Sequence, residues 1–148
     1  MKIPQLSLFL ENRPGQLRAP AQALGEAGID ILTISLADTR QFGILRLIVR
    51  DWARAKHVLE AAGHVVTVSD LLAVAVPDRP GGLAETLDAF ERAGLGVEYL
   101  YPFTVHQRGK FAPLLFRLED PDAAATALKA QGVRLLGAEE LFRREGDS

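Results

Sequence analysis

The chain has 148 residues, of which 48% are hydrophobic and 24% charged, and it carries a formal net charge of −2. This composition predicts a folded globular protein, and the charge gives no electrostatic reason to expect nucleic acid or an anionic membrane as a partner. There is no cysteine, which excludes disulfides, thiolate metal ligands and a cysteine nucleophile.

Neither end of the sequence indicates export or membrane insertion. No apolar run reaches membrane-spanning length, and no signal-like apolar segment follows Met1 before the charged Glu11. We therefore expect a cytoplasmic protein.

In chain order, the first half alternates extended and helical patterns. Apolar residues recur with a period of two in the strands and about 3.6 in the helices, and Gly28 and Gly63 are predicted helix stops. The predicted elements are strand 3–10, helix 14–28, strands 29–37 and 42–50, helix 52–62 and strand 64–69.

The second half repeats this order. The predicted elements are strand 71–77, helix 80–93, strands 95–103 and 111–118, helix 121–131 and strand 133–136. The hairpin between the two middle strands is three residues longer, around His106 to Lys110.

A short motif marks the repeat. Asn12-Arg13-Pro14-Gly15 returns 66 residues later as Asp78-Arg79-Pro80-Gly81, and Leu17 is matched by Leu83. We therefore divide the chain into residues 1–69 and 70–148. Units of this size are near the lower limit for independent stability, so we expect them to pack on each other or on a second chain.

The order βαββαβ in each repeat predicts an α+β fold of the ferredoxin-like type, a four-stranded antiparallel sheet with both helices on one face. Strands 29–37 and 42–49 carry apolar residues on both faces, which a half-exposed sheet would not need. Something should cover the open face or the sheet edges, and we favour a homodimer.

Both motifs, each between a strand and a helix ending in Ala-Gly, make the chain resemble a tandem pair of ACT domains. The resemblance covers residues 3–67 and 70–137. It implies amino-acid-sensing regulatory modules that pair edge to edge into an eight-stranded sheet. It also implies that ligands sit where two such domains meet.

The motif itself suggests an anion site. Pro14 or Pro80 in the first helical turn, with Asn12 or Asp78 at the cap, would present the helix amino terminus to a carboxylate. Glycine would let the ligand approach the backbone closely. The alternative is that these residues only provide good capping chemistry. The predicted ligand-binding residues of the two loops are Asn12, Arg13, Pro14, Gly15, Gln16, Leu17, Asp78, Arg79, Pro80, Gly81, Gly82 and Leu83.

The ammonium group of an amino acid would need an acceptor, and we assign Asp30, at the predicted start of the second strand, to this role. In side-by-side pairing, the loop of one domain would face the second strand of the other. Glu98 and Tyr99 would then face Asn12 to Gln16, with Tyr99 and Tyr101 forming either a pocket wall or simple packing.

Catalysis is not indicated. His57, His64 and His106 are scattered, and no metal, nucleophile or phosphate-loop motif is present, so we expect no enzyme activity, metal or cofactor. The predicted function is a sensor that binds an amino acid or a related carboxylate. The alternatives are an interaction module that binds nothing small, or a regulatory subunit of an amino-acid metabolic enzyme, such as acetolactate synthase.

Overall fold

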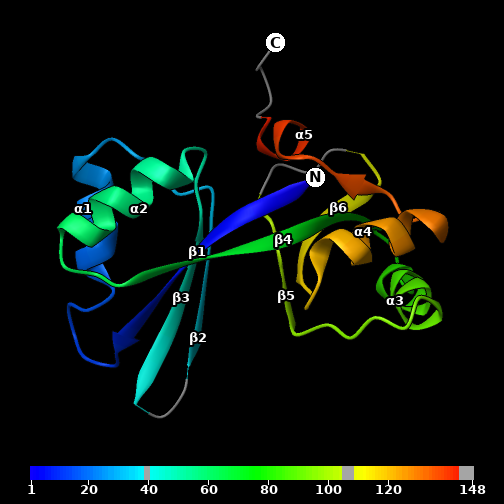
Figure 1. The fold of residues 1–148 in the computed structure, drawn as a ribbon, viewed down its shortest axis with the longest axis horizontal. Coiled ribbons are helices and arrows are strands. Elements are labelled where there is room, and N and C mark those ends of the chain that lie inside the picture. The colour runs from blue at the N-terminus through cyan, green and yellow to red at the C-terminus, as the bar shows by residue number, and fades with distance from the viewer. Residues whose placement is uncertain (39–40, 105–108, 144–148) are drawn as a thin grey trace. The chain divides into compact units, whose positions relative to one another are not determined.

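The computed structural model describes residues 1–38, 41–104 and 109–143, which contain seven strands and five helices (Figure 1). The chain forms two compact units. The N-terminal unit is residues 4–69, and the C-terminal unit runs from residue 70 onward and includes residues 1–3. The elements are β1 (Lys2–Glu11), α1 (Arg18–Glu26), β2 (Thr33–Asp38), β3 (Phe42–Ile48), α2 (Trp52–Ala61), β4 (Val66–Pro77), α3 (Gly82–Arg92), β5 (Tyr99–Pro102), β6 (Phe111–Arg117), α4 (Pro121–Ala130), β7 (Leu135–Leu136) and α5 (Ala138–Phe142).

In the N-terminal unit, β3 lies between β2 and β1 and is antiparallel to both. The start of β4 lies on the other side of β1, where the Thr67 hydroxyl donates a 3.5 Å hydrogen bond to the Ser7 carbonyl. The strand order β2-β3-β1-β4 is that of a ferredoxin-like sheet.

The C-terminal unit has the same order, with β6 between β5 and β4 and with β7 on the outer side of β4. Its register also matches. Leu8 lies opposite Leu45 in one unit, and their equivalents Val74 and Leu114 lie opposite each other in the other. The predicted α+β class and the tandem repeat are therefore confirmed.

Each unit has its own apolar core on the face of the sheet that carries two helices, α1 and α2 in one unit and α3 and α4 in the other (Figure 1). The alternating strand residues supply these cores, as period-two patterning requires. Phe90 and Phe116 pack with ring centroids 4.7 Å apart in the C-terminal unit. Leu24 and Leu47 are the fully buried equivalents in the N-terminal unit.

Several predicted boundaries were wrong. Predicted strands 64–69 and 71–77 form one strand, β4, so the described residues contain seven strands rather than eight. The second strand of each repeat begins later than predicted, at Thr33 and Tyr99. Of the longer hairpin loop, residues 105–108, and with them His106, lie outside the described residues.

Candidate functional site

The two motif loops, loop 12–17 and loop 78–81, have the same backbone hydrogen bonds. The Arg13 amide donates to the Glu11 carbonyl at 2.8 Å, and the Arg79 amide donates to the Pro77 carbonyl at 3.0 Å. Three further backbone amide-to-carbonyl hydrogen bonds are repeated. They run from Gln16 to Arg13 and from Gly82 to Arg79, from Ala19 to Gly15 and from Glu85 to Gly81, and from Asn12 to Gln41 and from Asp78 to Lys110. The motif therefore builds one loop geometry twice.

Glycine is required in both loops by the backbone itself. Gly15 and Gly81 have φ values of +88° and +84°, a left-handed region that other residues rarely adopt. A Cβ atom at either position would meet no atom within 4 Å. Conformation, rather than close packing, explains these two glycines.

The predicted capping role of Asn12 and Asp78 was wrong. The N-cap residues are Leu17 for α1 and Gly81 for α3, and neither helix has a side-chain cap. Pro14 and Pro80 accordingly lie in the loops before the helices rather than in their first turns. By contrast, Asp51 and Asp120 do cap α2 and α4, each accepting from a backbone amide at 3.1 Å.

The two helices that follow the motif therefore begin differently from α2 and α4. The partial positive charge at the amino end of a helix favours an anion. In α1 and α3 no side-chain cap hydrogen bond offsets that charge, although the Ala19 and Gly82 amides already donate to loop carbonyls. The arrangement supports anion binding through a feature that differs from the predicted one.

The two loops differ at two equivalent positions, Asn12 and Asp78 and then Gln16 and Gly82. A Cβ atom on Gly82 would lie 1.9 Å from the Pro77 carbonyl oxygen, so only glycine fits there. This close approach lets α3 begin at Gly82, whereas α1 begins two residues later in its repeat, at Arg18. The Gln16 amide makes the same turn hydrogen bond as the Gly82 amide, so the loops share this turn and differ in the residue where the helix begins.

Loop 12–17 borders a surface hollow of about 250 Å³. The Arg13 guanidinium forms an ion pair with the Glu11 carboxylate at its rim. The hollow therefore offers a cation, an anion and apolar side chains within one unit. Its lining residues are Leu10, Glu11, Asn12, Arg13, Leu17, Leu36 and Gly43.

Glu11 was missed by sequence reasoning. It is the last residue of β1, directly before the motif, and its equivalent in the second repeat is Pro77. The prediction rested on residues present in both repeats, and Glu11 is present in only one. An acidic residue directly before an anion-binding motif is the signal that could have identified Glu11 as an ammonium acceptor.

Loop 78–81 has a different charge pattern. Arg79 forms an ion pair with Glu85, which lies in the first turn of α3. A carboxylate in that position already interacts favourably with the amino end of the helix. The first turn of α1 has no acidic residue, so the amino end of α1 is the more favourable place for an added anion.

The other predicted site residues lie away from the loop of their own unit. Asp30 is in the connection after α1, at the opposite end of that helix from loop 12–17. Glu98 borders a separate hollow with Gly94 and Asp120, and its carboxylate lies 3.6 Å from the Arg117 guanidinium. Tyr99 is half-buried, and its ring stacks on Tyr101 with centroids 6.4 Å apart. Their assignment to a ligand site stays a prediction.

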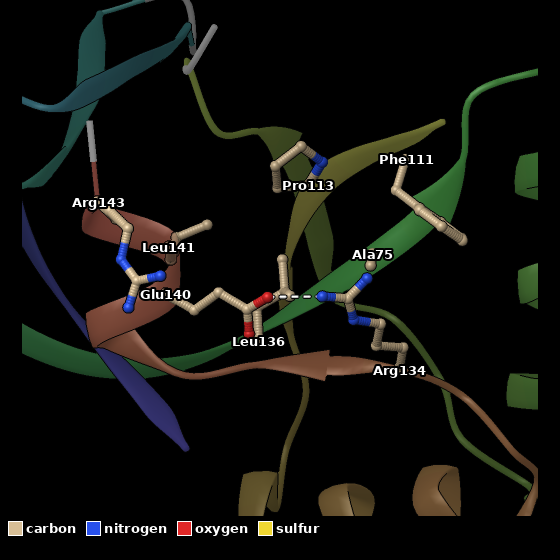
Figure 2. Close-up of a pocket in the computed structure, with 8 residues that line it drawn as sticks. All are labelled: Ala75, Phe111, Pro113, Arg134, Leu136, Glu140, Leu141 and Arg143. Atoms are coloured by element: carbon tan, nitrogen blue, oxygen red, sulfur yellow. Dashed lines mark hydrogen bonds and ion pairs between the residues drawn. The ribbon is translucent and has the colours of Figure 1, made fainter. Parts of the chain in front are cut away.

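A further pocket, of about 150 Å³, lies on the open face of the C-terminal sheet, under α5 (Figure 2). Figure 2 shows Arg134 reaching Glu140 of α5, with the ion pair at 2.6 Å. The same guanidinium lies 5.6 Å from the centre of the Phe111 ring. Leu141 is buried and closes one side, so α5 is held down by both charge and apolar contact.

Within residues 1–38, 41–104 and 109–143, no group of three or more His, Asp or Glu side chains could hold a metal ion. Nor does any helix in these ranges have the length and hydropathy needed to cross a bilayer.

Two ferredoxin-like units with a repeated strand-loop-helix junction define a tandem α+β domain protein. The chain matches the family described as the ACT domain pair over residues 1–143. It belongs to that family.

Solved structures agree with this fold. Protein BT0572 from Bacteroides thetaiotaomicron is 32% identical, each chain is covered over 97%, and the TM-score is 0.86. The ligand-free regulatory subunit of aspartate kinase from Thermus thermophilus is 20% identical, with 88% of this chain and 93% of that chain covered and a TM-score of 0.60. No curated protein matches the sequence.

Proposed function

We propose that this protein is an amino-acid sensor, a regulatory ACT pair that binds a free amino acid or a related carboxylate and catalyses nothing itself. The proposed domains are residues 1–69 and 70–148. The observation that carries the proposal is the repeated loop, which places an uncapped helix amino end beside the motif in each unit. Family membership and the fold of an aspartate kinase regulatory subunit support the regulatory role.

Loop 12–17 is the proposed primary site. The ligand carboxylate would take the amino end of α1, which lacks both a cap and an acidic residue in its first turn. The ammonium group would go to Glu11, and an aliphatic side chain would lie against Leu17 and Leu36. The hollow is slightly smaller than typical small-molecule sites of roughly 300–1,000 Å³, which suits a ligand of amino-acid size.

Pairing with another chain is part of the proposal. Ile34 and Leu36 are 49% and 52% exposed on β2, the outer strand of the N-terminal sheet. Apolar side chains on an outer strand favour edge-to-edge association with a second copy or with a regulated amino-acid metabolic enzyme.

The first experiment is a thermal-shift screen of the whole protein against the twenty amino acids and several aromatic acids. A ligand that binds only the folded state raises the melting temperature in a concentration-dependent way. The absence of any shift at millimolar concentrations would refute the sensor role and leave the interaction-module alternative.

A charge placed at the N-cap position then locates the site. Leu17→Asp should weaken binding at least about tenfold, or about 1.4 kcal/mol, because the new carboxylate repels the ligand and occupies the helix end. Leu17→Asn is the neutral control of the same shape. Leu83→Asp is the change at the equivalent repeat position of the other unit, where the residue lies in the first turn of α3 and not at its N-cap. Leu17 and Leu83 are 42% and 40% exposed, so folding should tolerate all three variants.

Unchanged affinity in both aspartate variants would refute binding at the helix ends, even if a ligand were found. A loss confined to Leu83→Asp would move the site to loop 78–81.

A further inference from the structure

The open face of the N-terminal sheet carries an exposed apolar patch, which we call the Phe9 patch and define as Phe9, Phe42 and Ile44. Phe9 lies opposite Ile44 across β1 and β3, and Phe42 is two positions from Ile44 on β3, so all three side chains share one face. It is the face opposite the core residues Leu8 and Leu10. Phe9 is 68% exposed and Phe42 is 46% exposed.

The equivalent positions in the C-terminal unit are partly covered. The matching register makes Ala75, Phe111 and Pro113 the equivalents of Phe9, Phe42 and Ile44. These three residues line the pocket in Figure 2 together with Leu141 of α5, while Phe111 stays 40% exposed. Ala75 is consequently only 7% exposed.

The chain explains why the N-terminal unit lacks this cover. In the C-terminal unit, β7 is followed by Gly137, the extended N-cap residue of α5, and then by α5 itself. The equivalent residues of the first repeat continue without a turn as β4, which runs to Pro77. No helix takes the place of α5 in the described part of the N-terminal unit.

We propose that the Phe9 patch is a sheet-to-sheet interface between two copies of this chain, with the patch of one copy packed against the patch of the other. Monomeric proteins rarely keep a clustered apolar surface of this kind in water. Large side chains from two sheets packed face to face interdigitate across about 10 Å.

The charges beside the patch identify a second copy as the occupant. Arg46 lies one row to one side of Phe9 and Ile44, opposite Ser7, and Glu11 lies one row to the other side, opposite Phe42. A two-fold axis along the Phe9–Ile44 row places the Arg46 row of each copy over the Glu11 row of the other. Arg46 then lies over the Phe42 position and reaches Glu11 diagonally, and Glu11 also pairs with Arg13 of its own chain. The surface is complementary to itself in hydrophobicity, and in charge through this diagonal contact, as an isologous interface requires.

This interface shares Glu11 with the proposed ligand site. It differs from pairing through β2, which uses Ile34 and Leu36 at the sheet edge, and assembly mass measured without ligand tests it apart from ligand binding. The test measures the assembly mass of the full chain by light scattering over a concentration series, for wild type and for Phe9→Lys. We expect the variant to have half the wild-type mass, or 16.1 kDa if the wild type is a simple dimer.

Two matched variants complete the test. Val65→Lys removes another exposed apolar side chain, 82% exposed and outside the patch, and should keep the wild-type mass. Ile34→Lys reports on the sheet edge separately. A monomeric wild type, or a Phe9→Lys protein of unchanged mass, would overturn the proposal and leave the face to a different partner or to none.

A charge exchange tests the row pairing. Arg46→Glu should weaken association, and the double variant Arg46→Glu/Glu11→Arg should restore it, because attraction between the rows returns with reversed sign. Rescue would not follow from a structural role of either residue within one chain. Failure of the double variant to associate would overturn the proposed orientation.

Discussion

The two units share a fold, a register and a loop geometry, but they treat the open face of the sheet in opposite ways. The C-terminal unit covers part of it with its own helix, α5, and places the small Ala75 beneath, while Phe111 stays 40% exposed. The N-terminal unit leaves it uncovered and places Phe9 at the equivalent position. The two repeats therefore share one scaffold. The segment that follows the last strand of each repeat determines whether the open face of its sheet is covered by a helix.

The largest expected effect comes from the two cores. Phe90→Ala should destabilise the C-terminal unit by about 3–5 kcal/mol, since it removes a fully packed ring and its contact with Phe116. Leu24→Ala, the matched change, should cost about 2–5 kcal/mol without loss of an aromatic pair. Urea denaturation of both variants measures this, and a Phe90→Ala cost below 1 kcal/mol would contradict the packing.

The next largest effect on stability is expected at Gly82, whose equivalent in the first loop is Gln16. Gly82→Ala should cost about 1–3 kcal/mol, because its Cβ would overlap the Pro77 carbonyl oxygen and force the loop to move. Gln16→Ala at the equivalent position should change stability by no more than about 0.5 kcal/mol. Equal effects at the two positions, measured by thermal denaturation, would show that the loops do not differ as described.

The helix caps should follow. Asp51→Ala and Asp120→Ala should each cost about 1 kcal/mol, because each leaves an amide of the first turn without its acceptor. Asn12→Ala should cost much less, since neither α1 nor α3 takes a side-chain cap. A cost for Asn12→Ala as large as that for Asp51→Ala would restore the capping role that the sequence predicted.

The smallest effects are expected at the exposed arginines of the two loops. Arg13→Ala and Arg79→Ala should each change stability by less than about 1 kcal/mol, because exposed ion pairs contribute little. Their effect on ligand binding should differ, with a loss for Arg13→Ala alone if loop 12–17 is the site. Isothermal titration calorimetry of the pair at two salt concentrations tests this difference.

The repeated order of strands and helices could be predicted because it depends on local periodicity. Leu6, Leu8 and Leu10 alternate on β1 as Leu72, Val74 and Val76 do on β4. The same pattern at equivalent positions of both repeats makes the strand assignment more specific. The break between predicted strands 64–69 and 71–77 was wrong because the boundary between the repeats was placed there, at Ser69 and Asp70. The structure keeps them extended within β4.

The site was harder to predict than the fold. Asn12 and Asp78 have side chains that favour helix caps, but the distance along the chain to the helix start depends on whether Gln16 or Gly82 follows. That is a steric property of the folded loop and has no sequence periodicity. Likewise, the run Ile29-Asp30-Ile31-Leu32 predicted a strand that includes Asp30. In the structure this run belongs to the connection between α1 and β2, and Ile29 and Ile31 pack against the core from there.

One hydrogen bond described above connects each motif loop to the hairpin end of the adjacent strand. The Asn12 amide donates to Gln41 at the β2–β3 hairpin, and the Asp78 amide donates to Lys110 beside the longer hairpin. These amides exchange with solvent only when that contact opens. The hydrogen-exchange rates of these two amides therefore report, separately for each half of the chain, whether a change at the motif loop also affects the neighbouring hairpin.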